Sequence, residues 1–320
     1  MAENIEPIKG TSLGRDAWKR LLKNKLAVFG LIVLGLMVLA VILGPPIIRW
    51  TTGLTADYIP SNGDLIKSFP PSREHWMGTD EAGRDLLARV LQGGRISLMV
   101  GIISTIVSLI VGVSYGAIAG YLGGKIDNVM MRIVDIIYAI PYILIVIVLL
   151  SVFGGPATPE WIQWLSTKIG GAGNQGLSQI FLLFLALGLV SWLTMARVVR
   201  GQVLSLKNQE FVMAAKATGV STFGIIFRHL VPNTLGPVIV YATLTVPSVM
   251  LTEAFLSFLG LGVQAPYASW GSLASDGIKN IAIFPWQLIF PGVTMALTLF
   301  SLNFLGDGLR DALDPQTRKF

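Results

Sequence analysis

The sequence predicts an all-α integral membrane protein with six transmembrane helices. Of its 320 residues, 53% are hydrophobic and only 13% are charged, whereas soluble domains carry about 25% charged residues. The chain also contains six stretches of roughly 20 mainly apolar residues, the length that a helix needs to cross the hydrocarbon core of a bilayer. Composition and segment length therefore both indicate a membrane protein rather than a water-soluble domain.

The six predicted spans differ in regularity. The first two carry no charged residue, and the first is too long and too charge-free to be a signal peptide. The third begins with Arg132 and Asp135, whose i,i+3 spacing predicts a local ion pair. The fifth contains Pro237, Pro247 and Glu253, which makes it less regular than a simple anchor. The predicted spans cover residues 26–48, 96–122, 129–153, 180–196, 235–259 and 283–305.

The basic residues predict that both termini lie in the cytoplasm. With that orientation, 16 of the 24 Lys and Arg residues fall inside, and six of the other eight lie in one long loop, which counts less in the positive-inside rule. The formal net charge of +6 is spread between apolar segments, so it does not indicate nucleic-acid binding. The absence of cysteine and the presence of only two histidines leave little for a metal site. We therefore expect a multi-pass plasma (inner) membrane protein in contact with lipid.

The long external loop, about residues 49–95, is predicted to end in an amphipathic helix from Asp80 to Gln92 on the outer membrane surface. Thr79 or Asp80 is a good helix cap, and Asp85 and Arg89 have the spacing of an i,i+4 ion pair. This helix is either a structural brace for the next span or a gate element or docking lip. Its apolar face consists of Leu86, Leu87, Val90 and Leu91.

The cytoplasmic loop between spans four and five, residues 201–234, is predicted to form a helix, a sharp turn and a second helix. Asn208 or Gln209 caps the first helix, Gly219 ends it in a left-handed conformation, and Ser221 caps the second, which Pro232 then stops. The first helix carries an apolar ridge suited to a groove on another protein, although it could instead pack as a cap on its own bundle. The ridge comprises Phe211, Val212, Met213, Ala214, Ala215 and Ala217.

The sequence lacks the motifs of an ATPase or of a common hydrolase. A P-loop requires Gly-Lys followed by Ser or Thr, and the one Gly-Lys pair, Gly124 and Lys125, is followed by Ile126. There is no H-E-x-x-H helix and no cysteine nucleophile. We therefore expect a non-catalytic chain, and a membrane-embedded enzyme becomes a weak alternative.

The cytoplasmic loop resembles that of the membrane subunits of binding-protein-dependent ABC importers. Their loop carries the pattern EAA, three residues, Gly, and a Pro about a dozen residues later. The residues that match here are Met213, Ala214, Ala215, Gly219 and Pro232. Met213 stands where the family usually has glutamate, and Glu210 lies one turn earlier. The resemblance therefore implies docking on an ATPase through shape, and it leaves a salt bridge from this loop in question.

Longer strings are similar to the oligopeptide and dipeptide permease branch of that family, and most similar to its C-type subunits. Examples are residues 75–98, 120–135, 192–211, 255–277 and 303–315. This resemblance implies the permease fold of type I ABC importers. It also implies a B-type permease partner, two cytoplasmic ATPases that bind ATP and Mg, and an extracytoplasmic peptide-binding protein.

On this interpretation the chain has three parts and a weakly polar pathway. Residues 1–25 form a cytoplasmic segment, residues 26–95 the first span with the external loop, and residues 96–320 a five-helix permease core.

Glu253 and Asn303 are candidates for the translocation pathway, because ionisable and polar groups inside spans are costly. Glu253 faces either a wet cavity or a hydrogen-bonding neighbour helix. Two alternatives stay open: a permease of the same branch for nickel or glutathione, and a self-sufficient secondary transporter, which commonly shows internal repeats that are not evident here.

Overall fold

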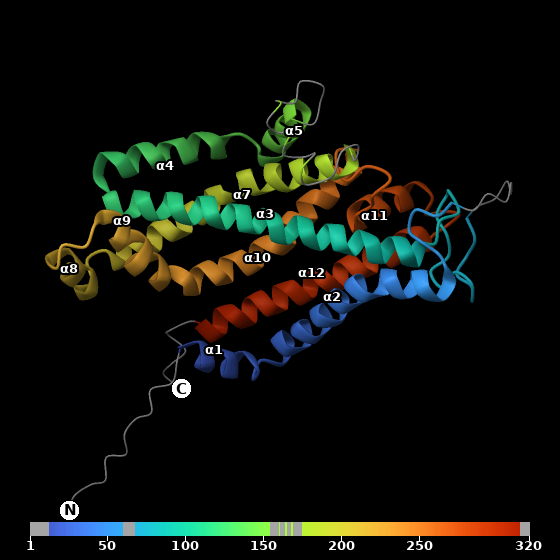
Figure 1. Ribbon diagram of the computed structural model, residues 1–320, viewed down its shortest axis with the longest axis horizontal. Coiled ribbons are helices and arrows are strands. Elements are labelled where there is room, and N and C mark those ends of the chain that lie inside the picture. The colour runs from blue at the N-terminus through green and yellow to red at the C-terminus, as the bar shows by residue number, and fades with distance from the viewer. Residues whose placement is uncertain are drawn as a thin grey trace, which may run out of the picture.

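The computed structural model describes residues 13–59, 68–153 and 175–313, together with Glu160, Trp164 and Lys168. Long helices run side by side along the longest axis of the molecule (Figure 1). The described elements are α1 (Leu13–Leu21), α2 (Lys25–Thr52), α3 (Leu86–Leu122), α4 (Gly124–Ala139), α5 (Tyr142–Phe153), α7 (Gln175–Leu206), α8 (Glu210–Ala217), α9 (Thr222–Gly224), the π-helix η1 (Ile225–Leu230), α10 (Val231–Phe258), α11 (Trp270–Lys279) and α12 (Trp286–Leu313).

The prediction of an all-α protein with six spans is confirmed, but the third span is broken. Within the described residues, five helices are long and apolar enough to cross a bilayer, and α4 with α5 makes a sixth, bent by 87°. The break falls at Ile140, whose φ of −84° and ψ of 132° are extended. Its successor is Pro141, and a proline disfavours the helical conformation of the residue before it.

Close contact between α3 and α7 forms the centre of the bundle. Three glycines of α3, one turn apart, face α7, and a Cβ on Gly116 would lie 2.3 Å from the carbonyl oxygen of Ala196. A Cβ on Gly112 would likewise lie too close to Met195, and a Cβ on Gly120 too close to Arg200, at somewhat longer distances. Because glycine has no side chain, the two backbones approach closely, as small residues allow in membrane helix pairs.

The predicted amphipathic surface helix from Asp80 to Gln92 is wrong. α3 begins at Leu86, is capped by the Asp85 carboxylate that accepts from the amide of Ala88 at 2.8 Å, and runs without a break to Leu122, across the expected boundary at residues 95 and 96. Asp80 belongs to the preceding turn, where it accepts from two backbone amides. Since Leu86 and Val90 are buried against the protein, their apolar face reflects packing and not contact with the membrane surface.

The two predicted local ion pairs are also wrong, because Asp85, Arg89 and Asp135 have partners elsewhere. Asp135 accepts from Arg197 of α7 at 2.8 Å instead of pairing with Arg132. Arg89 contacts Asp80, while Asp85 lies 2.9 Å from Nδ1 of His75. Partners across the fold replace neighbours on one helix.

Pro232 does not stop the second helix of the cytoplasmic loop. The helix is continuous from Thr222 to Phe258, and Pro232 occupies the second position of α10. The six residues of η1 that precede it form a π-helix. This wider turn accommodates the proline ring, which would clash with the carbonyl four residues earlier in a regular α-helix.

The bundle has two distinct ends (Figure 1). α8, α9, α1 and the last turns of α12 gather at one end, where Leu21 of α1 and Ala27 of α2 share a buried cluster with Ala312 of α12. α11 and the connection between α2 and α3 lie at the other end. Of the predicted cytoplasmic segment 1–25, residues 1–12 lie outside the described part of the chain.

Candidate functional site

The segment from Glu210 to Leu230 projects from one end of the bundle as a short helix, a turn and a second helix (Figure 1). Gln209 precedes α8 in an extended conformation, and Gly219 has a φ of +77°. The hydroxyl of Ser221 accepts from the amide of Gly224 at 3.2 Å and so caps α9. The predicted positions of the helix starts and of the left-handed glycine are confirmed.

The apolar ridge predicted on α8 is divided between two faces. Val212 and Ala215 are buried against η1, whereas Met213 and Ala214 are exposed. Phe223 of α9 is 71% exposed, so it extends the outward apolar surface across the turn. This outward surface, which we call the docking surface, comprises Phe211, Met213, Ala214 and Phe223.

Lysine side chains connect this segment to the bundle. The ammonium of Lys216 lies 5.2 Å from the ring centroid of Tyr121, at the end of α3. That of Lys207 donates to the carbonyl of Gly120 at 3.2 Å. Glu210, in the first turn of α8, and Pro232 are both exposed. The segment is therefore tied to α3 on one side and open on the other.

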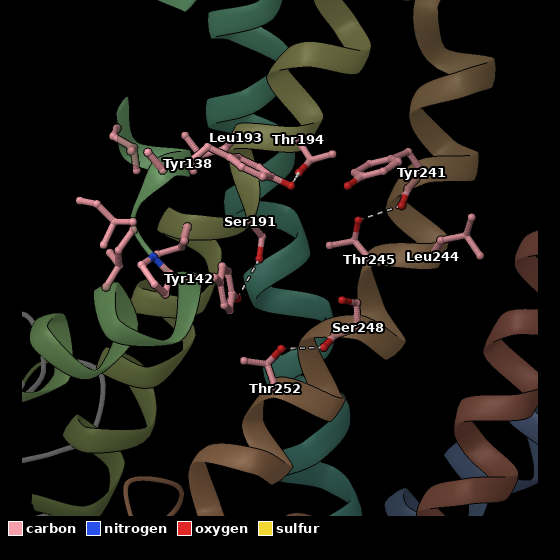
Figure 2. A pocket seen from close by; sticks show the side chains of 16 residues that line it. Tyr138, Tyr142, Ser191, Leu193, Thr194, Tyr241, Leu244, Thr245, Ser248 and Thr252 are labelled. Carbon is pink, nitrogen blue, oxygen red and sulfur yellow. Dashed lines mark hydrogen bonds between the residues drawn. The ribbon is translucent and has the colours of Figure 1, made fainter. Parts of the chain in front are cut away.

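A cavity of about 590 Å³ lies between the bend of α4 and α5, α7 and α10. Tyr138 and Tyr142 flank the bend, Ser191 and Thr194 come from α7, and a row of side chains comes from α10 (Figure 2). The described residues that line the cavity include no Asp, Glu, Lys, Arg or His. Its α10 wall is formed by Tyr241, Leu244, Thr245, Ser248 and Thr252.

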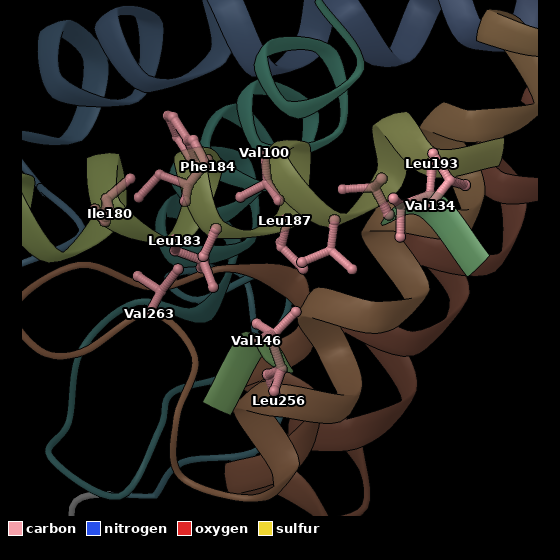
Figure 3. Close-up of a cluster of buried hydrophobic side chains, with 14 residues drawn as sticks. Val100, Val134, Val146, Ile180, Leu183, Phe184, Leu187, Leu193, Leu256 and Val263 are labelled. Atoms are coloured by element: carbon pink, nitrogen blue, oxygen red, sulfur yellow. The ribbon is translucent and has the colours of Figure 1, made fainter. Parts of the chain in front are cut away.

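A buried apolar cluster fixes the walls of this cavity relative to one another. Val134 of α4, Val146 of α5, Leu187 of α7 and Leu256 of α10 all belong to it, and each is fully buried (Figure 3). Inside a membrane such side chains hold helices together through van der Waals packing and not through the hydrophobic effect, because lipid chains are just as apolar. The bend of α4 and α5 is therefore held by packing on both sides of Ile140.

Ion pairs hold α4 to α7 on the side of the cavity that faces α8. Arg200 donates from Nε and Nη2 to the two carboxylate oxygens of Asp127, at 2.5 and 2.7 Å. Such bidentate pairs are among the stronger charged contacts. Arg197, paired with Asp135, lies 4.3 Å from the ring centroid of Tyr138.

The two pathway candidates from the sequence do not line this cavity. Glu253 is 1% exposed, and its Oε1 accepts from the hydroxyls of Ser257, at 2.7 Å, and Ser269, at 2.6 Å. Asn303 is exposed on α12 and donates to the carbonyl of Leu299 at 2.9 Å. Of the two interpretations open for Glu253, the structure supports a hydrogen-bonding role.

The cavity residues carried a signal in the sequence that motif analysis missed. Tyr241, Thr245, Ser248 and Thr252 are spaced by four, three and four residues, which places them on one face of a helix. A polar stripe of that kind in an apolar span marks an internal face. The sequence analysis also missed α11 (Trp270–Lys279) and its cap at Ser269.

Among the described residues, no group of three or more His, Cys, Asp or Glu could hold a metal ion.

Comparison with known proteins gives matches over almost the whole chain. Residues 112–319 match the family of the binding-protein-dependent transport system inner membrane component. Residues 12–62 match the N-terminal TM domain of oligopeptide transport permease C.

Individual relatives align at nearly full length. The oligopeptide transport system permease protein OppC of Escherichia coli (strain K12) is 50% identical over 318 residues, which are 99% of this chain and 95% of that protein. OppC of Bacillus subtilis (strain 168) is 44% identical over 318 residues, 99% and 94% of the two chains. The dipeptide transport system permease protein DppC of the same organism is 44% identical over 317 residues, 98% and 90%. The chain therefore belongs to the inner-membrane components of binding-protein-dependent ABC importers, in the branch of the C-type oligopeptide and dipeptide permeases.

Proposed function

We propose that this chain is one of two pore-forming subunits of an ATP-dependent importer that moves oligopeptides or dipeptides across the plasma membrane. The relatives named as oligopeptide and dipeptide permeases align with it from end to end. These comparisons support a permease of an ABC importer, and they do not support a secondary transporter or a permease for nickel or glutathione.

The observation that carries the mechanism is the docking surface on α8 and α9. Its apolar side chains are exposed at the end of the bundle, while Lys216 ties α8 to α3 and Lys207 ties the connection before α8 to α3. An exposed apolar surface held in place in this way suits a groove on another protein. We assign that groove to one of two cytoplasmic ATPases, which would transmit its movement through α3 and the continuous helix of η1 and α10.

The roles of the partner chains follow from what this chain lacks and provides. Because the sequence has no P-loop, ATP and Mg bind on the ATPases, and this chain is not an enzyme. A B-type permease completes the pore, and an extracytoplasmic peptide-binding protein delivers the substrate. We place α8 and both termini in the cytoplasm, in line with the positive-inside count.

Affinity purification from mild detergent tests this assignment. The wild-type chain is expected to bring down a B-type permease and two ATPase chains, and Phe223→Ala to reduce recovery of the ATPases. Trp76→Ala is the matched control, because Trp76 is 73% exposed, similar to Phe223, but lies in the connection at the other end of the bundle. Recovery of the chain alone, together with peptide uptake by it alone, would contradict the proposal.

A further inference from the structure

The cavity between the α4–α5 bend, α7 and α10 is unusual in what its walls offer to a ligand. Its volume of about 590 Å³ lies within the range of about 300–1,000 Å³ that small-ligand sites occupy. Tyrosine, threonine and serine side chains come from four separate elements to line it (Figure 2). The cavity therefore offers hydroxyls and aromatic rings set among aliphatic side chains, and its described lining has no ionised group.

The hydroxyl protons of two threonines on the α10 wall are already engaged. Thr245 donates to the carbonyl of Tyr241 at 2.8 Å, and Thr252 donates to the carbonyl of Ser248 at 2.9 Å. A hydroxyl that donates its proton keeps two lone pairs that can accept. Both threonines therefore act toward the cavity as hydrogen-bond acceptors.

The α7 wall has the same character. Ser191 donates to the carbonyl of Leu187 at 2.7 Å, and its oxygen lies 3.4 Å from the hydroxyl of Tyr142. Because the proton of Ser191 is engaged by the carbonyl, Tyr142 is the donor in that contact. The phenolic oxygen of Tyr142 then also presents lone pairs.

These acceptors discriminate among the molecules that could fill the space. A lipid acyl chain has no donor to offer, and a transmembrane helix of a partner uses its own N–H groups internally. An extended peptide carries an unpaired N–H on every residue other than proline. Tyrosine ring faces also attract cations such as a terminal ammonium, as the guanidinium of Arg197 over Tyr138 illustrates.

We infer that this cavity is a binding station for the transported peptide, which it holds by accepting hydrogen bonds from main-chain N–H groups. The inference rests on the proposed function, because it presupposes that peptides pass along this chain. Since every peptide shares these N–H groups, such a site binds peptides of varied side chains equally. A peptide carboxylate finds no cationic partner among the described lining residues.

The test compares a tripeptide with its depsipeptide, in which an ester oxygen replaces one main-chain N–H. Uptake of both is measured with the complete importer in vesicles at a saturating concentration of binding protein. The variant Thr245→Val with Thr252→Val removes two acceptors while keeping side-chain shape. The control is Thr243→Val, because Thr243 also donates within α10, to the carbonyl of Ile239 at 2.9 Å, but does not line the cavity.

The wild-type importer is expected to take up the tripeptide about fivefold better than the depsipeptide, the effect of roughly one hydrogen bond. The double variant should lose that preference, and Thr243→Val should retain it. Any preference of the binding protein itself affects the wild type, the double variant and Thr243→Val alike. An unchanged preference in the double variant, or an equal loss for both peptides, would overturn the inference and assign the cavity to lipid or to a partner helix. Absence of uptake of either peptide by the wild type would overturn the proposed function as well.

Discussion

At the residue scale, Gly219 determines the direction in which α9 leaves α8. Its φ of +77° is a left-handed conformation, which glycine adopts freely and which costs other L-residues about 1–2 kcal/mol. A Cβ at this position would meet no atom within 4 Å. A substitution therefore acts through the backbone, and not through a clash with this chain.

We predict that Gly219→Val leaves the chain inserted and paired with its B-type partner but weakens attachment of the ATPases and stops peptide uptake. A β-branched residue disfavours the left-handed turn, so the two halves of the docking surface lose their relative orientation. Gly219→Asn should retain most activity, because asparagine tolerates this conformation. The measurements are co-purification of the ATPases and transport-coupled ATP hydrolysis in reconstituted vesicles.

Two outcomes would count against this explanation. Normal assembly and uptake with Gly219→Val would mean that the segment of α8 and α9 is not the coupling element. An equal loss with Gly219→Val and Gly219→Asn would mean that the small size of glycine matters more than its φ.

Also at the residue scale, Glu253 shows why sequence spacing could not identify its role. Its i+4 neighbour Ser257 is visible from helical periodicity, but Ser269 is reached only after the chain has turned into α11. The sequence marked Glu253 as unusual inside a span and could not choose between a cavity and a hydrogen-bonded neighbour. Tertiary contact between α10 and the start of α11 decides it.

At the scale of elements, α2 is attached to α3 through two backbone carbonyls of α2 that have no N–H partner within that helix. Pro45 and Pro46 lie inside α2 and lack the N–H groups that would bond to the carbonyls four residues earlier, those of Val41 and Ile42. Arg95 of α3 donates to both carbonyls, from Nε and Nη2, at 2.5 Å each. One guanidinium therefore satisfies the two acceptors that two prolines leave open.

We predict that Arg95→Ala lowers the midpoint of thermal unfolding of the purified protein, because it leaves two carbonyls unpaired at about 1–3 kcal/mol each. In a background of Pro45→Ala with Pro46→Ala the same change should cost much less, since alanine N–H groups then bond to Val41 and Ile42. This double-mutant cycle measures the coupling directly. Arg95→Lys should lie between, because an ammonium lacks the planar fork that reaches both carbonyls.

Additive effects in that cycle would disprove the coupling of Arg95 to the two prolines. Arg95 would then matter only through its packing against α2.

Two elements show what hydrophobic patterning can and cannot predict. The apolar stripe that includes Leu86 and Val90 was visible in the sequence, but a stripe facing a bilayer surface and one facing Trp270 look the same. The break before Pro141 was visible as a proline inside a span, whereas its angle of 87° depends on the packing of α4 and α5 against α7. Sequence therefore predicts which segments are helical more reliably than what each face contacts.

At the scale of the whole molecule, the arrangement of the ends gives the bundle a direction. The docking surface, α1 and the end of α12 lie together, and α11 with the connection between α2 and α3 lies opposite (Figure 1). The number of spans could be predicted, because hydrocarbon thickness sets helix length. The cavity could not, because it requires α4, α5, α7 and α10 to meet, and no local pattern encodes that meeting.

The direction of the bundle in the membrane is set, on our proposal, by its basic residues, and cysteine labelling tests it. The wild-type chain has no cysteine, so Lys216→Cys and Glu74→Cys each introduce one exposed thiol, at opposite ends of the bundle. An impermeant maleimide added to intact cells, with the outer membrane opened where one is present, should label Glu74→Cys and leave Lys216→Cys unlabelled. Once the plasma membrane is made permeable, both should react, which shows that the thiol at position 216 is accessible in the folded protein. Labelling of Lys216→Cys from outside intact cells would reverse the orientation and would remove the docking surface from the side on which ATP is available.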